Sequence, residues 1–458
     1  MKKHVSKLLW LVMATSLAVG CSSAPSTKAP ADTAQGDTQT EQESETEAPS
    51  EGLDKNIEAT LTIAIWDNVT NELYEELDIE GRFQKYYPNV TIEVEKLKDD
   101  SEYWNAMKIR ASADQLPDLM FNKTFTLSRF KDYLYDLNDT EAAKNNMVAE
   151  GYAIDSKIYG VPEKQGGEYV FYWKDMFDEV GIEVPDTWDE FVDAGVKLQE
   201  YYGKDNPNFM GIAIGAKDEW PNYPFTEFMP AADSGDGFLW NSMAKMDEPF
   251  AEGTSFNKTY QKINKLFTSN AFGKDPLGIG NDQAVALFAQ KNAGMMAIGS
   301  WALTGMKEGA DSLEGLETFY LPARDSESDP FRYVTQGDSF LSVTQHSENP
   351  ELAKAFLEFY FSEDWYPDYI NAIPDEPTVK GVTKEKDPIL QTADVYMPEK
   401  ELVMYDGGGD DFNALVSATK FDYKKLGAEM FVPGFDLNKK FDELNKAWKE
   451  ARTSLGIK

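Results

Sequence analysis

The chain has 458 residues, and its 80 acidic and 44 basic side chains give a formal net charge of −36. A field of that sign repels nucleic acid, so we expect no nucleic-acid partner. With one cysteine and two histidines, the chain lacks the side chains for a disulfide framework or a cysteine- or histidine-rich metal site.

An export signal is the first element predicted along the chain, over residues 1–20. Its apolar run, Leu8 to Val19, is too short to span a bilayer. The residues Leu17–Ser22 resemble the lipobox of bacterial lipoproteins, with Ala18 where that family favours leucine. The resemblance implies cleavage before Cys21 and a diacylglycerol, which carries acyl chains such as palmitate, on its thiol. The alternative is an ordinary cleaved signal with an incidental cysteine.

A disordered tether is predicted over residues 21–56. This segment is rich in Ser, Thr, Ala, Pro, Gln and Glu and has no Trp, Tyr or Phe, so it cannot bury enough apolar surface to order itself. A flexible chain of that length has a mean reach on the order of 30 Å. No later apolar run is long enough to cross a membrane, so we expect the lipid to be the membrane attachment.

The folded region opens with alternating strands and helices. Strands are predicted at 61–66, 90–94 and 119–121, and helices at 71–86 and 101–113, the first of them ended by Pro88. This alternation predicts a parallel sheet, and ligands gather at the carboxyl ends of such strands. The polar or aromatic residues at those ends are Trp66, Asp67, Asn68, Asn122, Lys123 and Phe125.

Several later segments carry local signals. Thr187 and Glu190 form a capping box that opens a helix over 188–201, and Pro350 opens another. We expect four tryptophans to be packing residues: Trp188, Trp240, Trp365 and Trp448. In contrast, Trp220 and Tyr223 lie in a proline-broken segment, where we expect an exposed loop.

Three further motifs are assigned to turns and loops. Asp233–Gly237 lacks the spacing of a calcium loop and is interpreted as a tight turn. Tyr405–Asp411 is glycine-rich but has no following lysine, so we expect a flexible acidic loop rather than a phosphate site. His346 is expected to be exposed in a loop.

Segments in the same order as in a known family cover nearly the whole folded region. They resemble motifs of the maltose-binding-protein-like, sugar-binding solute receptors (family 1) of ABC importers. The segments are Phe83–Val90, Leu116–Leu119, Ile158–Pro162, Phe171–Phe177, Pro185–Phe191 and Ala293–Trp301. Trp173 departs from the pattern, because the family has asparagine there.

The resemblance implies an α/β, two-lobed, periplasmic-binding-protein-like fold of class II, with hinge strands and a central ligand cleft. We expect the chain to cross between lobes near Phe171, Leu321 and Asp364. The N-terminal lobe would then contain 57–171 and 321–364, and the C-terminal lobe 172–320 and 365–458.

The resemblance also implies a monomeric receptor that is no enzyme and needs no cofactor. Such a protein captures a carbohydrate, here an oligosaccharide, and closes on it. It then delivers the ligand to ABC permease subunits with a cytoplasmic ATPase. The expected location is the outer face of the cytoplasmic membrane.

A sugar site needs flat aromatic surfaces for the apolar ring faces and planar polar groups for the hydroxyls. By position in the fold, or by match to the family, the predicted ligand-binding residues are Trp66, Asp67, Asn68, Asn122, Lys123, Glu163, Gln165, Trp220, Tyr223, Trp301 and Asp338. We predict no catalytic or metal-binding residue.

Two other classes of function remain open. In the first alternative, the protein has the same fold but binds a polyamine or a peptide; a polyamine would suit an acidic cleft. In the second, the protein is a secreted glycoside hydrolase, which needs only two suitably spaced carboxylates.

Overall fold

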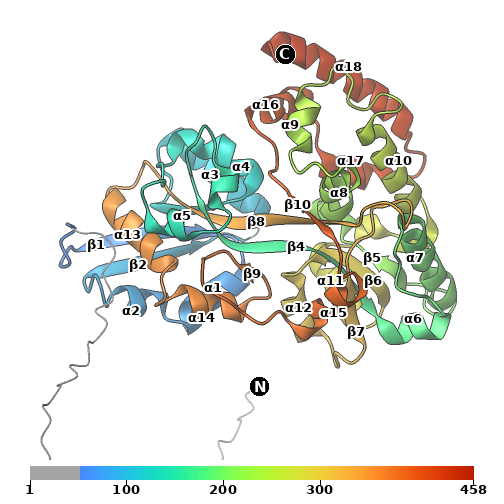
Figure 1. Cartoon of the computed structure of the whole chain (residues 1–458), viewed down its shortest axis with the longest axis horizontal. Helices are drawn as coiled ribbons and strands as arrows, with labels where there is room; N and C mark the ends of the chain where they lie inside the picture. Colours follow the sequence, from blue (N-terminus) through green and yellow to red (C-terminus); the bar gives the residue numbers. More distant parts are fainter. Residues whose placement is uncertain (1–51, 99) are drawn as a thin grey trace, which may run out of the picture. The chain divides into compact units, whose positions relative to one another are not determined.

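The strand β4 (Val161–Trp173) pairs with four other strands in a computed structural model of the chain (Figure 1). The structure describes residues 52–98 and 100–458. The predicted signal peptide, Cys21 and the predicted tether as far as residue 51 lie outside the described residues.

Ten strands form the described sheet, in the order β2-β1-β3-β8-β4-β6-β5, with β7, β9 and β10 paired off this path. Their bounds are β1 Ala59–Ile65, β2 Val90–Lys96, β3 Leu119–Asn122, β5 Met210–Ala213, β6 Ala293–Gly299, β7 Leu316–Phe319, β8 Arg332–Val343, β9 Glu376–Pro377 and β10 Glu401–Met404. β1 is parallel to both β2 and β3, which confirms the parallel arrangement predicted for the first three strands.

β4 changes partners half-way along its length. Its first half, Val161–Gly167, pairs with β8, whereas Glu168–Tyr172 pairs with β6 and Val170–Trp173 with β7. In Figure 1, β4 and β8 accordingly extend from the group β1–β3 toward the group β5–β7. One continuous strand is therefore shared by both ends of the sheet.

Two large hydrophobic clusters lie on either side of this change. The first core packs around β1–β3 and the second around β5–β7. Helices that contribute to the first core are α1 Asn68–Glu76, α2 Ile79–Phe83, α5 Glu141–Asn145, α13 Pro350–Tyr360 and α14 Tyr366–Ala372. Our lobe boundaries at individual residues stay a prediction.

The second core draws on most of the remaining helices. These are α6 Lys174–Val180, α7 Trp188–Tyr202, α8 Met229–Ser234, α9 Leu239–Ala244, α10 Ser255–Phe267, α11 Asn281–Ala289, α12 Ala302–Gly309, α15 Pro388–Tyr396, α16 Asp410–Thr419, α17 Tyr423–Met430 and α18 Leu437–Leu455. Two more helices, α3 Asp100–Ala113 and α4 Thr124–Phe130, pack in smaller clusters beside the first core.

Short helical turns complete the described elements. They are η1 Lys131–Tyr133, η2 Ala149–Tyr152, η3 Ala216–Asp218, η4 Trp220–Asn222, η6 Asn270–Phe272 and η7 Pro276–Gly278, together with the π-helix η5 Pro224–Phe228.

Local signals in the sequence fix several of these elements. The capping box at α7 is present, because Glu190 Oε2 accepts from the backbone N–H of Thr187 at 3.0 Å. The four tryptophans assigned to packing are at most 2% exposed, as predicted. Asp233 and Ser234 still belong to α8, and Gly235 ends this helix in the left-handed conformation, so the turn predicted over 233–237 begins only at Gly235.

Two local predictions are wrong. The helix expected over 71–86 is broken, because Asp78 adopts φ 55° and its side chain caps α2 by accepting from Gly81 N at 3.1 Å. His346 is not exposed: its ring stacks on Tyr133, and its Nδ1 lies 2.9 Å from Asp114 Oδ1. In both cases a short polar side chain makes a contact that periodicity does not reveal.

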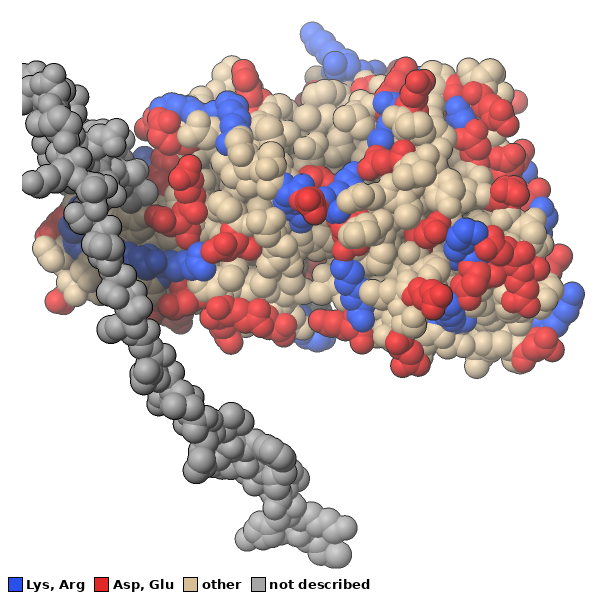
Figure 2. Space-filling model, turned by 60° about the horizontal axis from the view of Figure 1, so that its bottom comes forward, with Lys and Arg blue, Asp and Glu red and all other residues tan. Residues whose placement is uncertain are grey.

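The acidic excess is a surface property. In the face that Figure 2 shows, Asp and Glu side chains are spread over the molecule with Lys and Arg among them. No helix among residues 52–98 and 100–458 has the length and hydropathy that a membrane span requires.

Asp118 connects three segments of the first core, which leads to a prediction. Its Oδ2 accepts from Thr62 N and Thr62 Oγ1, both at 2.8 Å, and its Oδ1 from Ser347 Oγ at 2.6 Å. Asp118→Ala leaves these donors without their acceptor and should lower the free energy of unfolding by about 2–4 kcal/mol. Urea denaturation measures this, with the exposed Asp132→Ala as the control. Equal midpoints for both variants would contradict the assigned role.

Candidate functional site

The change of partners in β4 brings buried acidic groups together. Glu163 is 1% exposed and accepts hydrogen bonds from Tyr360 Oη at 2.7 Å and Tyr369 Oη at 3.2 Å. Burial raises the pKa of Glu163 to about 7, although the adjacent Lys164 ammonium opposes the rise. A carboxyl group with this pKa exchanges its proton near neutral pH.

Glu168, five positions along the same strand, is bonded to an aromatic group. It is 8% exposed and accepts a hydrogen bond from Tyr223 Oη at 2.7 Å. Burial raises the pKa of Glu168 to about 8. Tyr223 Oη in turn accepts from Gly299 N at 2.9 Å and from Trp301 Nε1 at 3.4 Å. The chain of contacts therefore runs from β4 to the start of α12.

Trp301 presents the aromatic surface of this group. It is 37% exposed, the largest exposure of any tryptophan among the described residues. Trp220 lies beside it, with ring centroids 5.7 Å apart, and Trp220 also stacks on Tyr223 at 6.2 Å. We call Trp220, Tyr223 and Trp301 the second aromatic wall, because they border the second core.

A first aromatic wall borders the first core and consists of Trp66, Trp104 and Phe125. The ring centroids of Trp66 and Trp104 are 5.6 Å apart, and those of Trp104 and Phe125 are 6.0 Å apart. All three side chains are half-buried. Trp104 Nε1 donates to Asp100 Oδ1 at 2.8 Å, which fixes the indole on α3.

An ion pair links the first wall to β8. Lys123 Nζ lies 3.2 and 3.3 Å from the two carboxylate oxygens of Asp338 and 5.3 Å from the Trp66 ring centroid. Burial by itself would raise the pKa of Asp338, but Lys123 and Lys164 outweigh it and hold that pKa below its usual value. Asp338 is therefore an ionised acceptor.

Several of the predicted ligand-binding residues already use their polar atoms in hydrogen bonds within the protein. Asn122 is fully buried, and its amide binds Ser342 Oγ at 3.0 Å and Thr126 Oγ1 at 2.9 Å. Asp67 caps α1 by accepting from Thr70 N at 2.7 Å. Gln165 Nε2 donates to Thr335 Oγ1 at 3.1 Å, and Asn68 is exposed at the start of α1.

Tyr223 corrects one expectation. We expected it and Trp220 to be exposed in a loop, but Trp220 is half-buried at the start of η4, and Tyr223 is 9% exposed and lies between η4 and η5. Its hydroxyl is held by Glu168, and its ring meets Phe228 edge-on at 5.4 Å. The hydroxyl thus positions Trp301, whereas the ring is largely packed.

Sequence reasoning missed a buried carboxylate between α14 and β9. Asp375 is 4% exposed, and its Oδ1 accepts from Ser300 Oγ at 2.6 Å. Lys164 Nζ lies 3.8 Å from the other oxygen of Asp375. Phe125 had a local signal, because it follows the third predicted strand, and the Trp104 ring lies one helical turn from the carboxylate that it binds. Asp375 joins the group only through contacts between distant segments.

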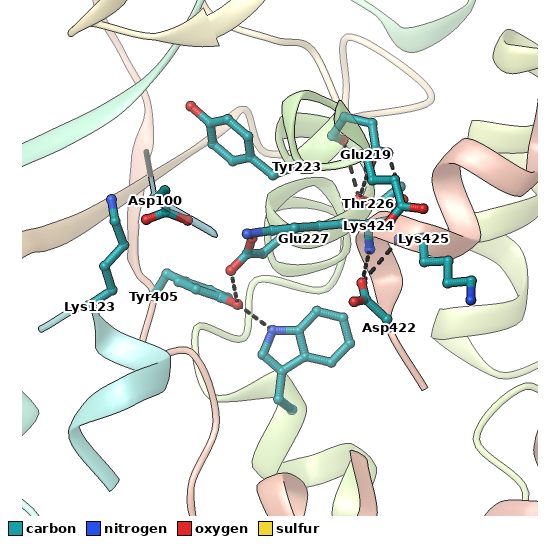
Figure 3. A network of polar contacts seen from close by, with 12 residues as sticks. Asp100, Lys123, Glu219, Tyr223, Thr226, Glu227, Tyr405, Asp422, Lys424 and Lys425 are labelled. Atoms are coloured by element: carbon teal, nitrogen blue, oxygen red, sulfur yellow. Dashed lines mark hydrogen bonds and ion pairs between the residues drawn. The ribbon is translucent and has the colours of Figure 1, made fainter. Parts of the chain in front are cut away.

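A second polar network lies farther along the second core (Figure 3). Tyr405 Oη donates to Glu227 Oε1 at 2.8 Å and accepts from Trp240 Nε1 at 2.6 Å. Lys424 Nζ lies 3.6 Å from Glu227 Oε2 and 5.3 Å from the Phe125 ring centroid. The prediction of a flexible acidic loop over Tyr405–Asp411 is therefore wrong, because Tyr405 is fully buried and hydrogen-bonded and Asp410 already begins α16. The neighbouring Lys424 reaches the first aromatic wall.

The family is shown by comparison with known proteins. A family model described as bacterial extracellular solute-binding protein matches residues 62–367, so the chain belongs to that family. Its members are binding proteins rather than enzymes, and they act outside the cytoplasm. No group of acidic, histidine or cysteine residues in the described part of the chain has the arrangement of a metal site.

Two relatives have names that refer to sugars. A multiple sugar-binding protein of Streptococcus mutans is 24% identical over 318 residues, which are 68% of this chain and 73% of that protein. An arabinooligosaccharide-binding protein of Halalkalibacterium halodurans is 25% identical over 276 residues, which are 57% of this chain and 58% of that protein.

Solved structures support the fold. RafE of Streptococcus pneumoniae, in complex with raffinose, has a TM-score of 0.71 at 20% identity and covers 86% of this chain and 99% of its own. A mannobiose complex of a binding protein from Bifidobacterium animalis subsp. lactis has a TM-score of 0.70 at 17% identity, covering 87% and 96%. The two-lobed, periplasmic-binding-protein-like α/β fold predicted from the sequence is confirmed.

The buried Glu168 gives a prediction about pH. In the unfolded chain its pKa is about 4.3, so between that value and about 8 the folded protein alone holds the proton. The free energy of unfolding should therefore fall as pH rises through this window and level off above it. Glu168→Gln removes the titrating group and therefore this loss. The free energy of unfolding of the variant, relative to that of the wild type, should be higher at pH 9 than at pH 5 by on the order of 3–4 kcal/mol.

Denaturant titrations at the two pH values measure the difference. Glu72→Gln, at an exposed position on α1, is the control and should follow the wild type. If the free energy of unfolding of Glu168→Gln changes with pH as that of the wild type does, then Glu168 does not have the raised pKa assigned to it.

Proposed function

We propose that the chain is a receptor for a neutral oligosaccharide, which it binds between the two aromatic walls and the polar groups at the crossing of β4. The observation that carries the proposal is the exposed indole of Trp301. Its edge is hydrogen-bonded to Tyr223, so its face is free to cover the apolar face of a sugar ring. The carboxylates of Asp338, in β8, and of Asp375, directly before β9, suit sugar hydroxyls.

The names of the relatives support this ligand class. The two relatives are named for sugars, and the two solved structures hold raffinose and mannobiose. Two walls of aromatic rings, one beside each core, also suit a ligand with more than one ring. The ligand contacts that we propose are the residues predicted from the sequence, with Trp104, Phe125, Lys164 and Asp375 added.

We further propose that binding closes the two lobes, with hinges in the strands that cross between them. The closed form would deliver its sugar to ABC permease subunits, driven by a cytoplasmic ATPase. The shared strand β4 supports this mechanism, because small changes in its backbone dihedrals reorient everything attached beyond it.

A thermal-shift panel tests the ligand class. The panel contains raffinose, mannobiose, arabino-oligosaccharides, amino acids, short peptides and polyamines. A ligand at 100 times its Kd stabilises the folded chain by about 2.7 kcal/mol, which is readily measured. A selective shift with a saccharide that is recovered intact supports a sugar receptor; shifts confined to peptides or polyamines would overturn the ligand class.

Removing the exposed indole should weaken binding without unfolding the protein. Trp301→Ala should lower the affinity for the saccharide found in the panel by roughly ten- to hundredfold, since it removes the stacking surface. Calorimetric titration measures the affinity. Phe238→Ala removes an aromatic ring that is 53% exposed elsewhere and should leave the affinity unchanged. Equal affinities for both variants would show that the sugar does not bind at the second aromatic wall.

We also propose that the chain is anchored by a lipid on Cys21. The lipobox-like sequence before that residue supports the anchor. Cys21→Ala should shift the protein from the membrane fraction to the soluble fraction of fractionated cells, because the variant lacks the thiol to which the diacylglycerol would be attached. Ala18→Leu, which restores the residue that lipoboxes favour, should leave it in the membrane fraction. Continued membrane attachment of Cys21→Ala would refute lipidation.

A further inference from the structure

The side chain of Lys164 lies where three strands meet. In β4 it pairs with Asp338 of β8 on one side and with Pro377 of β9 on the other. Its side chain is 16% exposed, and its ammonium lies between Glu163 and Asp375. Sequence reasoning did not assign it a role.

The ammonium of Lys164 is weakly held by the protein. Nζ lies 3.5 Å from Glu163 Oε1 and 3.8 Å from Asp375 Oδ2, beyond the 2.7–2.9 Å typical of charged hydrogen bonds. None of the described residues accepts a hydrogen bond from it. An ammonium has three donors, and leaving them unused in a buried site is costly. The group is therefore poised to donate to a bound molecule.

Other buried lysines of the chain are bonded differently. Lys123 donates to both oxygens of Asp338. Lys262, which is 17% exposed, donates to Asp233 at 2.9 Å and to the carbonyl of Ala323 at 3.0 Å. Lys164 thus differs from a lysine whose role is structural.

The charges around Lys164 restrict what it can bind. The carboxylates of Asp338 and Asp375 repel an anion, and the ammonium repels a cation. A hydroxyl group satisfies both signs, since its oxygen accepts from the ammonium and its hydrogen is donated to a carboxylate. Asp375 is also bonded to Ser300, the residue before Trp301, so this polar group adjoins the second aromatic wall.

We infer that Lys164 is a specificity-determining residue of the site: it donates hydrogen bonds to a hydroxyl oxygen of a neutral sugar and excludes ligands that carry an amine. The inference rests on the proposed sugar-binding function. Lys164 is then the side chain that discriminates between a sugar and a polyamine.

Calorimetric titration of the full chain tests the inference with four probes. Raffinose and mannobiose are the neutral probes, and spermidine and a trimer of glucosamine are the cationic ones. The wild type should bind a neutral probe and reject both amines. Lys164→Gln should bind that neutral probe about ten- to hundredfold more weakly, and its preference for neutral over cationic probes should shrink. Lys164→Arg keeps the charge and should still reject the amines.

Lys262→Gln is the matched control, because it removes an equally buried lysine and should keep the wild-type affinity and preference. Circular dichroism confirms that each variant is folded. If the wild type binds a neutral probe and Lys164→Gln binds it equally well, the inference is overturned while the proposed function stands. If the wild type binds only the amines, both are overturned. If it binds none of the four probes, the titration is repeated with the arabino-oligosaccharides of the thermal-shift panel, and a lack of binding there as well overturns both.

Discussion

The hydrogen bonding of β4 to different partners along its length is the constraint on which the rest of the structure depends. Its first half belongs to the sheet of the first core and its second half to that of the second core. Side chains project from the two faces of a sheet, and near the change of partners they meet aromatic side chains of both cores: Tyr360 and Tyr369 bind Glu163, and Tyr223 binds Glu168. Glu163 and Glu168 are consequently buried where the two cores adjoin along β4, and the Lys164 side chain is 16% exposed between them.

Burying ionisable groups there has a clear electrostatic result. Burial favours the neutral form of Glu163 and Glu168, whereas Lys123 and Lys164 keep Asp338 ionised. The site therefore combines neutral carboxyl groups, carboxylates and an ammonium within a small region. This mixture suits a hydroxyl-rich ligand, because each hydroxyl both donates and accepts, and it disfavours any ligand with a large net charge of its own.

The sequence predicted elements whose signals are local and missed those set by tertiary contacts. The capping box of Thr187 and Glu190 and the parallel strands β1–β3 followed from short-range patterns. The break at Asp78 did not, because its capping role competes with a helical periodicity that is otherwise continuous. At the site, Trp301 matched a family motif and is exposed, but the contacts of Lys164 with Asp375 join residues more than 200 positions apart.

Hydrogen exchange measured by mass spectrometry, with and without a bound oligosaccharide, tests the central claim that the ligand lies at the β4 crossing. The backbone amides around Gly166–Glu168 lie in β4 and those around Gly299–Trp301 at the end of its neighbour β6, and both segments adjoin the same polar groups. The account predicts that a saturating sugar slows exchange in both segments together, by about tenfold or more. Protection confined to another surface, such as the depression lined by Glu248, Asp442 and Lys449, would contradict it.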